Sequence, residues 1–249
     1  MDRSPANTIT TGKIKTGEVV AAGIRRRIAN GELEIGDRLP SEEELTEELG
    51  IARTTLREAL RVLESQGLIS IKRGRGGGPI VTMPNLDRLA EPLAVVLQLR
   101  GTTTTDLDAA RALIEPNMAA WLAARHTHDD VTALGVAAGE AEAAADANDQ
   151  ARFGRAAALV HETLLLRSGN HTLSVLSQVL HRMVLDRYVG AASGSTQVLM
   201  QRAAKSYTKL VRLIAEGDAN AARTHWEQQM GWMATEGTGD APLDIFDTD

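Results

Sequence analysis

The 249-residue sequence contains no cysteine, which excludes disulfide bonds, cysteine nucleophiles and thiolate zinc sites. No run of about 18 apolar residues is present, so we expect no membrane-spanning helix. The first residues, MDRSPANTITTGKIK, lack the apolar core of a signal peptide, so we expect the protein to remain in the cytoplasm. There are six histidines but no nucleophile elbow, paired-histidine metal motif or phosphate loop, which disfavours an enzyme.

What is present is typical of a soluble globular protein, with 43% hydrophobic and 24% charged residues. This length favours two domains over one. The net charge of −6 is unevenly divided, since residues 1–78 carry +1 and the remainder carries −7. Between Arg53 and Arg75, six Lys or Arg and two Glu give a local charge of +4. The N-terminal part is therefore the candidate for binding a polyanion, which the acidic remainder would repel.

Helix and turn signals follow one another in this basic part. TGEVVAAGIRRRIANGEL has the apolar spacing of a helix. SEEELTEELG begins with a capping box between Ser41 and Glu44 and ends at Gly50, a residue favoured at helix C-termini. After the three residues 51–53 the next helix is under way, and it is followed by a strand, LISI, a basic turn, KRGRGGG, and a returning strand, PIVT. Three helices and a two-stranded wing predict a winged helix-turn-helix.

In such a fold the second helix of the pair enters the DNA major groove with its N-terminal residues leading. Arginine suits a bidentate contact with guanine, and threonine hydroxyls reach phosphates or bases. Alternatively, Arg57 and Arg61 form only a solvated helix face, a hypothesis that the agreement of capping, turn and wing signals disfavours. The predicted DNA-contacting residues are Arg53, Thr54, Thr55 and Arg57 on the helix, and Lys72, Arg73, Gly74 and Arg75 on the wing.

The segment GDRLPSEEELTEELGIARTTLREALRVLESQGLI closely resembles the DNA-binding domain of GntR-family bacterial regulators, and the likeness covers about residues 15–82. Many relatives have a serine cap where this chain has Ala52, and we expect Thr55 and Glu58 to form a substitute capping box. Relatives often have a phosphate-gripping arginine after the PSE motif, where this chain has Glu43.

The rest of the chain is rich in alanine and leucine and predicts helices throughout, with breaks near Thr127, Asn148, Gly169, residues 190–194 and Gly217. ARALIEPNMAAWLAAR, FGRAAALVHETLLLRSGN and LIAEGDANAAR resemble the FadR-like branch of the same family, whose C-terminal helical bundle is called the FCD domain.

We therefore expect a mainly α protein, with an N-terminal winged helix-turn-helix followed by an all-α helical-bundle effector domain. The expected parts are a disordered arm at 1–14, the DNA-binding domain at 15–82, a linker at 83–86, a ligand-sensing and dimerisation domain at 87–236, and a flexible tail at 237–249.

Many FCD domains bind a divalent metal through one aspartate and three histidines. The resemblance aligns these positions with Ala157, His161, Tyr207 and Gln229, so His161 is the only matching ligand. His225 lies one helical turn before Gln229 and is a candidate substitute, but two imidazoles make a poor site. We expect no metal and no cofactor.

Arg111 opens an R-x-x-x-E pattern and resembles the family arginine that receives an acidic effector, for which its guanidinium fork is suited. The alternatives are a simple pair between Arg111 and Glu115 at i+4, and a hydrogen-bonded core histidine at His161. The expected effector-binding residues are Arg111, Asn117, His161, Arg187, Tyr188, Tyr207 and Gln229. Core or dimer packing is expected for three tryptophans, Trp121, Trp226 and Trp232.

These features predict a homodimeric DNA-binding transcriptional regulator, a repressor of a metabolic operon released by an acidic metabolite, either an organic acid or an acyl-coenzyme A. The dimer follows from the resemblance and from the need for two recognition helices on palindromic double-stranded DNA. We expect a cytoplasmic protein, associated with the bacterial nucleoid when bound, with no membrane partner. The alternatives are a metal-dependent FCD-type sensor, an activator, an architectural DNA-binding protein without effector, and a metal-dependent enzyme.

Overall fold

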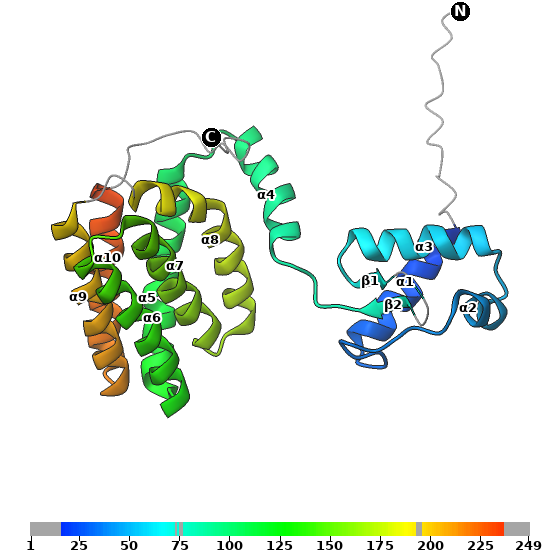
Figure 1. Cartoon of the computed structure of the whole chain (residues 1–249), viewed down its shortest axis with the longest axis horizontal. Helices are drawn as coiled ribbons and strands as arrows, with labels where there is room; N and C mark the ends of the chain where they lie inside the picture. The colour runs from blue at the N-terminus through cyan, green and yellow to red at the C-terminus, as the bar shows by residue number, and fades with distance from the viewer. Residues whose placement is uncertain (1–15, 73, 75–76, 193–195, 237–249) are drawn as a thin grey trace, which may run out of the picture. The chain divides into compact units, whose positions relative to one another are not determined.

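The computed structural model describes the backbone of residues 16–72, 74, 77–192 and 196–236. Side chains within these ranges are described except those of residues 16, 184–192 and 233–236. The chain divides into two compact units, with the boundary after Arg88 (Figure 1). The expected disordered arm at 1–14 and flexible tail at 237–249 lie outside the described residues.

The first unit contains three helices, α1 (Thr16–Ala29), α2 (Glu42–Leu49) and α3 (Arg53–Ser65). α3 buries one apolar face, formed by Leu56, Ala59, Leu60 and Leu63, which recur at helical spacing. These side chains join a core with residues of α1, including Ala21 and Ile24. Packing of α3 on α1 fixes which side of α3 remains exposed to solvent.

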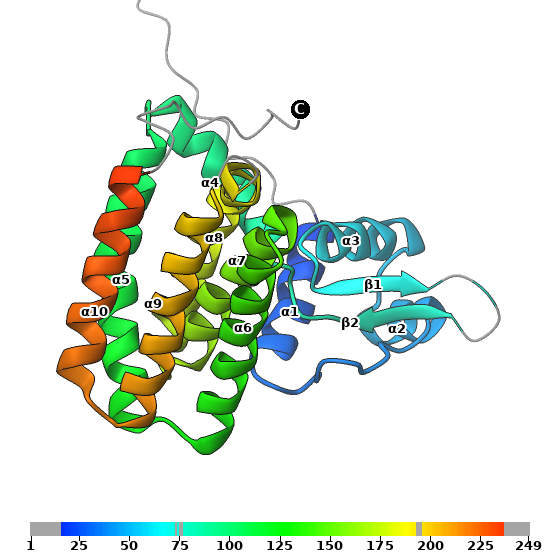
Figure 2. The same cartoon turned by 60° about the vertical axis from the view of Figure 1, so that its left-hand side comes forward.

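The wing consists of β1 (Ile69–Lys72) and β2 (Gly78–Val81), which pair antiparallel with Ile69 opposite Val81 (Figure 2). Ile69 and Val81 point into the core, whereas Lys72 at the outer end of β1 is exposed. Gly77 donates a backbone hydrogen bond to Gly74, and a Cβ atom at Gly77 would collide with the carbonyl oxygen of Lys72. Glycine is therefore required for the tight turn at the tip of the wing.

The expected capping box of α2 is present. Ser41 Oγ accepts from the backbone N–H of Glu44, whose carboxylate accepts from the backbone N–H of Ser41, and Gly50 ends the helix in the left-handed conformation. The substitute box expected from Thr55 and Glu58 is wrong, because α3 already begins at Arg53. Its N-cap residue is Ala52, which provides no side-chain hydrogen bond. The start of α3 is therefore set by the preceding turn and by packing.

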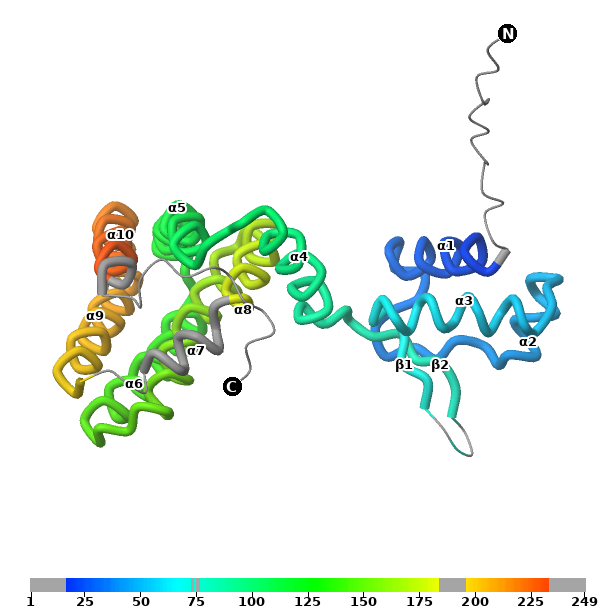
Figure 3. The backbone as a smooth tube through the Cα atoms, turned by 90° about the horizontal axis from the view of Figure 1, so that it is seen from above, coloured from blue at the N-terminus to red at the C-terminus, as the bar shows by residue number. Residues whose placement is uncertain are grey.

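The second unit is built from helices joined by short turns (Figure 3). These helices are α4 (Asp87–Leu99), α5 (Thr104–Arg125), α6 (His128–Asp146), α7 (Gln150–Arg167), α8 (His171–Ala192), α9 (Gln197–Ala215) and α10 (Ala219–Glu236). α5 is central, since it contacts α7, α8, α9 and α10. Alanine-rich faces allow these helices to approach closely, and the core includes Ala119, Ala137, Ala141 and Leu164.

The expected fold class, a winged helix-turn-helix followed by an all-helical bundle, is confirmed. Within the described ranges, no helix is both long enough and apolar enough to span a membrane.

Candidate functional site

The N-terminal half of α3 presents most of the predicted DNA-contacting side chains to solvent. Arg53, Thr54 and Arg57 are exposed, and Thr55 is half-buried. They remain exposed because the opposite face of α3 packs into the core. Arg53 and Arg57 are four residues apart, so both side chains project from the same side of the helix.

Both arginines contact glutamates from the first turn of α2. Arg53 Nη2 lies 3.1 Å from Glu43 Oε1, and Arg57 Nε donates to Glu42 Oε2 at 3.0 Å. The expected DNA-reading surface thus carries a carboxylate paired with each of these two arginines. The sequence had indicated that Glu43 replaces a family arginine but not that it pairs with Arg53.

On the wing, Lys72 and Gly74 are exposed near the tip. Gly74 has a φ of 107°, a conformation that L side chains rarely adopt. The predicted contacts by Arg73 and Arg75 lie outside the described residues.

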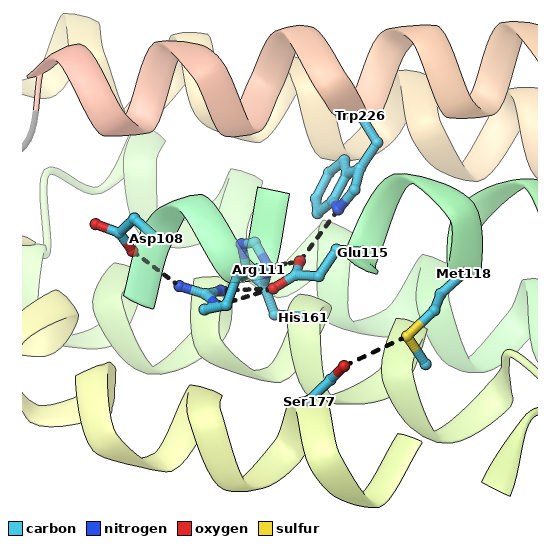
Figure 4. A network of polar contacts seen from close by, with 7 residues as sticks. All are labelled: Asp108, Arg111, Glu115, Met118, His161, Ser177 and Trp226. Carbon is cyan, nitrogen blue, oxygen red and sulfur yellow. Dashed lines mark hydrogen bonds and ion pairs between the residues drawn. The ribbon is translucent and has the colours of Figure 1, made fainter. Parts of the chain in front are cut away.

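A second cluster of polar side chains lies in the middle of the helical bundle (Figure 4). Arg111 and Glu115, one turn apart on α5, have no exposed surface. Arg111 Nε donates to Glu115 Oε1 at 2.9 Å, and Arg111 Nη2 lies 2.8 Å from the same oxygen. Arg111 Nη1 also lies 3.5 Å from a carboxylate oxygen of Asp108. The pairing of Arg111 with Glu115, considered from the sequence as an alternative, is present.

The other oxygen of Glu115 is held by side chains from two further helices. Trp226 Nε1 on α10 donates to Glu115 Oε2 at 3.1 Å, and His161 Nδ1 on α7 lies 2.7 Å from it. Burial opposes ionisation of Glu115, but the charges of Arg111 and His161 outweigh burial and hold the pKa of this carboxyl below its usual value. An ionised carboxylate only accepts, so His161 Nδ1 must carry the hydrogen and its Nε2 is turned away from Glu115.

The bundle also contains buried polar atoms without a hydrogen-bond partner among the described residues. They are His161 Nε2, both ring nitrogens of His181, and Gln229 Nε2. His181, on α8, stacks on His161 with ring centroids 5.7 Å apart. Burial, followed by the charges of Arg111 and His161, lowers the pKa of His181 to about 3, so this ring is neutral at neutral pH. A neutral imidazole offers one donor and one acceptor to a ligand.

Two more predicted residues are buried in the same bundle. The Tyr207 ring, on α9, lies 6.2 Å from His161 and 6.0 Å from Trp226 between ring centroids. Burial and then the charge of Glu115 raise the pKa of Tyr207, so its phenol stays protonated. Gln229 is buried one turn after Trp226 on α10.

Not every predicted effector-binding residue joins the cluster. Asn117 is exposed and its side-chain amide donates to the backbone of Leu113, because a residue six positions after Arg111 lies on another side of α5. The expected place of Asn117 in the lining is therefore wrong. The side chains of Arg187 and Tyr188 lie outside the described residues.

Comparison with known families gives two matches that together span most of the chain. Residues 16–77 match "Bacterial regulatory proteins, gntR family", and residues 106–231 match the FCD domain. The galactonate operon transcriptional repressor of Escherichia coli is 30% identical over 76% of this chain and 84% of its own length. The chain belongs to the GntR family.

Other relatives and a solved structure agree with this assignment. The HTH-type transcriptional regulator LutR of Bacillus subtilis is 28% identical over 78% of this GntR chain and 89% of its own length. The structure titled Streptococcus agalactiae GntR shares the fold, with a TM-score of 0.70 and 23% identity over 89% of this chain and 100% of that one. The protein is therefore a DNA-binding transcriptional regulator with an FCD domain and not an enzyme.

The side chains at the aligned metal positions of this GntR regulator do not fit a divalent metal. Ala157 offers no ligand atom, and Tyr207, with its raised pKa, does not supply a phenolate. His225, the candidate substitute, has its Nε2 2.9 Å from the backbone oxygen of Ser206. Among the described residues no group of three or more His, Asp or Glu side chains is arranged to hold a metal.

Sequence reasoning missed three members of the bundle cluster. Glu115 was considered only as a partner of Arg111, although its carboxylate is the centre of the network. The sequence predicts only core or dimer packing for Trp226 and gives no signal for His181. No local motif marks Trp226 or His181, since they meet His161 only because α7, α8 and α10 pack around α5.

Proposed function

We propose that this protein is a homodimeric repressor of a metabolic operon, acting in the cytoplasm on the bacterial nucleoid and released from palindromic DNA by a small organic acid. The observation that carries the effector site is the set of buried, unpartnered nitrogens of His161 and His181 next to Arg111, together with that of Gln229 in the same bundle. Such groups cost free energy when they lack partners. A ligand that supplied the missing hydrogen bonds would recover that cost.

The chemistry of these nitrogens favours a ligand with both donors and acceptors, as a hydroxylated carboxylic acid has. The neutral ring of His181 needs one donor and one acceptor on the ligand, and Gln229 Nε2 needs acceptors. Arg111 supplies the positive charge, for which the ligand carboxylate competes with Glu115. The name of one relative, the galactonate operon repressor, contains a compound of this class and supports the proposal.

The proposed DNA contacts follow the general docking of the helix-turn-helix. The N-terminal residues of α3 enter the major groove, where Arg53 and Arg57 read bases. The proposed wing contacts, with the flanking backbone or minor groove, are those expected from the sequence for Lys72, Arg73, Gly74 and Arg75. Two copies are needed for a palindrome, and a repeated apolar stripe on α4 offers a surface for a second copy. This stripe consists of Leu89, Leu93 and Val96, all partly exposed at helical spacing.

Release requires that the ligand bind the released arrangement better than the DNA-bound one. A tenfold preference supplies about 1.4 kcal/mol per protomer, so two occupied effector sites reduce operator occupancy substantially. Neither domain needs to unfold for this effect.

His181→Leu gives a sharp test of the effector site. The change removes both unpartnered ring nitrogens, breaks no hydrogen bond described in the structure and leaves an apolar side chain of similar size. We expect the variant to bind operator DNA as the wild type does, to be at least as stable, and to lose release by organic acids. The measurements are operator-binding titrations and thermal melting with a panel of hydroxy acids, sugar acids and acyl-coenzyme A compounds. Leu159→Ala, at a partly exposed apolar position on α7, is the control.

The possible results separate the alternatives. Release of both proteins at the same acid concentration would show that the nitrogens of His181 are not part of the effector site. If only acyl-coenzyme A compounds released the protein from DNA, the effector would be an acyl-coenzyme A and not a small organic acid. A reporter gene whose expression falls when the regulator is deleted would identify an activator, the role stated in the name of the Escherichia coli Glc operon relative.

A further inference from the structure

α2 has an unusual charge for a helix next to the DNA-reading helix. Its sequence, EEELTEEL, carries five glutamates and no basic residue. In helix-turn-helix docking the helix before the recognition helix crosses the phosphate backbone. Carboxylates there repel phosphate, so this chain has less non-specific attraction for DNA than a neutral or basic α2 would give it.

Two of these glutamates contact the arginines that lead α3. Glu43 Oε1 lies 3.1 Å from Arg53 Nη2, and Glu42 Oε2 accepts from Arg57 Nε at 3.0 Å. The side chains of Arg53 and Glu43 are 67% and 73% exposed, so the contact contributes little to folding. The contact therefore matters for DNA binding by Arg53 and not for stability.

We infer that Glu43 is a positioning residue for base recognition. It orients the guanidinium of Arg53 for guanine, and it competes with DNA phosphates for contact with that guanidinium. Glu42 acts on Arg57 in the same way. The inference rests on the docking of α3 proposed above.

The geometry of the guanidinium allows both contacts at once. A guanidinium has three nitrogens, and the contact with Glu43 uses Nη2 of Arg53. Nη2 carries two N–H bonds, and Glu43 Oε1 accepts only one of them. The second N–H of Nη2 can pair with an N–H of a neighbouring nitrogen to form the two parallel donors that a bidentate contact with guanine O6 and N7 needs. Because Glu43 already restricts the side chain, less conformational freedom is lost when Arg53 meets its base.

The same contact weakens binding to the wrong sequence. A guanidinium paired with a carboxylate releases fewer counterions from DNA than an unpaired one. Where no guanine meets Arg53, phosphate must compete with Glu43 and also approach its negative charge. Glu43 therefore raises the ratio of specific to non-specific affinity.

The test uses the full-length protein and a duplex that it selects itself. Wild-type protein first enriches its preferred sequence from random 20-base-pair duplexes, and a scrambled duplex of the same composition serves as non-specific DNA. Both affinities are then measured over a range of salt concentrations for wild type and Glu43→Gln. Glu47→Gln is the matched control, because it removes the same charge from an exposed position one turn along α2.

We expect Glu43→Gln to reduce the ratio of specific to non-specific affinity by about twofold to tenfold, the cost of ordering one long side chain. Its salt slope on scrambled DNA should become steeper by about 0.9, equivalent to one additional phosphate contact. Repeated selection should show a weaker preference at one base pair. Glu47→Gln should raise both affinities together and leave the ratio and the preferred sequence unchanged.

A double-mutant cycle with Arg53→Ala separates positioning from general charge. Without Arg53, Glu43→Gln should change the two affinities as Glu47→Gln does. Equal ratios for Glu43→Gln and Glu47→Gln in the presence of Arg53 would overturn the role of Glu43, even though DNA binding itself is intact. Failure of the wild type to enrich any sequence would instead overturn the proposed operator recognition, and the positioning role with it.

Discussion

Two arginine–glutamate pairs in this protein share their chemistry and differ in their surroundings. Arg111 and Glu115 meet at 2.8 Å with no exposed surface, whereas Arg53 and Glu43 meet at 3.1 Å with about two thirds of each side chain in water. Water replaces a lost partner at the surface, but a buried charge without its partner has no substitute. The buried pair is therefore tied to folding, while the exposed pair can contact DNA with little effect on folding.

The largest difference between the two pairs should appear when each loses its carboxylate charge. Glu115→Gln leaves Arg111 buried beside a neutral amide, and we expect a loss of about 3–5 kcal/mol in the free energy of unfolding. Glu43→Gln should change that quantity by less than about 1 kcal/mol. Chemical denaturation followed by circular dichroism measures both. Similar losses in the two variants would contradict the comparison.

Acid should weaken the buried cluster before it affects exposed pairs. The pKa of His181 is lowered from 6.5 to about 3, because burial and then the charges of Arg111 and His161 oppose protonation. Between these pH values the unfolded chain binds a proton at His181 that the folded chain does not. Stability therefore falls as the pH decreases, by at most about 1.4 kcal/mol per pH unit.

Denaturation at pH 6.5 and pH 5 should show a loss of about 2 kcal/mol from this residue in the wild type. His181→Leu should lack that part of the loss. The lowered pKa of Glu115 adds to the loss only below its ordinary value near 4.5. Burial is the main cause that lowers the pKa of His225, and the resulting loss of stability in acid is the same in the wild type and in His181→Leu. An unchanged pH dependence in His181→Leu would show that another group titrates.

At the exposed surface, the expected effect is on binding and not on folding. Arg57→Ala should weaken operator binding by about 1–3 kcal/mol if Arg57 reads a base. Arg223→Ala is the control, because Arg223 also forms an exposed pair with a glutamate, Glu227, but lies on α10 of the bundle. Fluorescence anisotropy with the selected duplex measures both variants. Equal affinities would place Arg57 outside the interface.

A smaller effect is expected at the helix that carries Arg53. Ala52 provides no side-chain cap for α3, so Ala52→Ser should stabilise the protein by about 1 kcal/mol. Ser41→Ala, which removes the cap of α2, should destabilise it by a similar amount. Thermal melting of the two variants should therefore give shifts of opposite sign, and a destabilised Ala52→Ser would show that the serine side chain cannot reach the backbone of α3.

The smallest effect is expected from chelation. Since Ala157, Tyr207 and Gln229 do not form a metal site with His161, a chelator should leave thermal stability and operator release unchanged. Elemental analysis of the purified protein provides an independent measurement. One tightly bound divalent metal per chain that is lost in His161→Ala would contradict this account of the bundle centre.

Much of the first unit was predictable because its signals are local. The capping box of Ser41 and Glu44, the left-handed Gly50 and the glycine-rich turn at the wing are each set by neighbouring residues. The start of α3 was less predictable, since Ala52 gives no capping signal and the helix begins there through the turn and its packing.

The sequence by itself determined the succession of elements and their helical faces, because these follow from spacing, caps and glycines a few residues apart. Only the tertiary structure decided which buried polar groups meet. Glu115 is held by Arg111 from its own helix, by His161 from α7 and by Trp226 from α10, and His181 from α8 stacks on His161. These contacts join residues up to 111 positions apart, and the packing of helices, not the local pattern, brings them together.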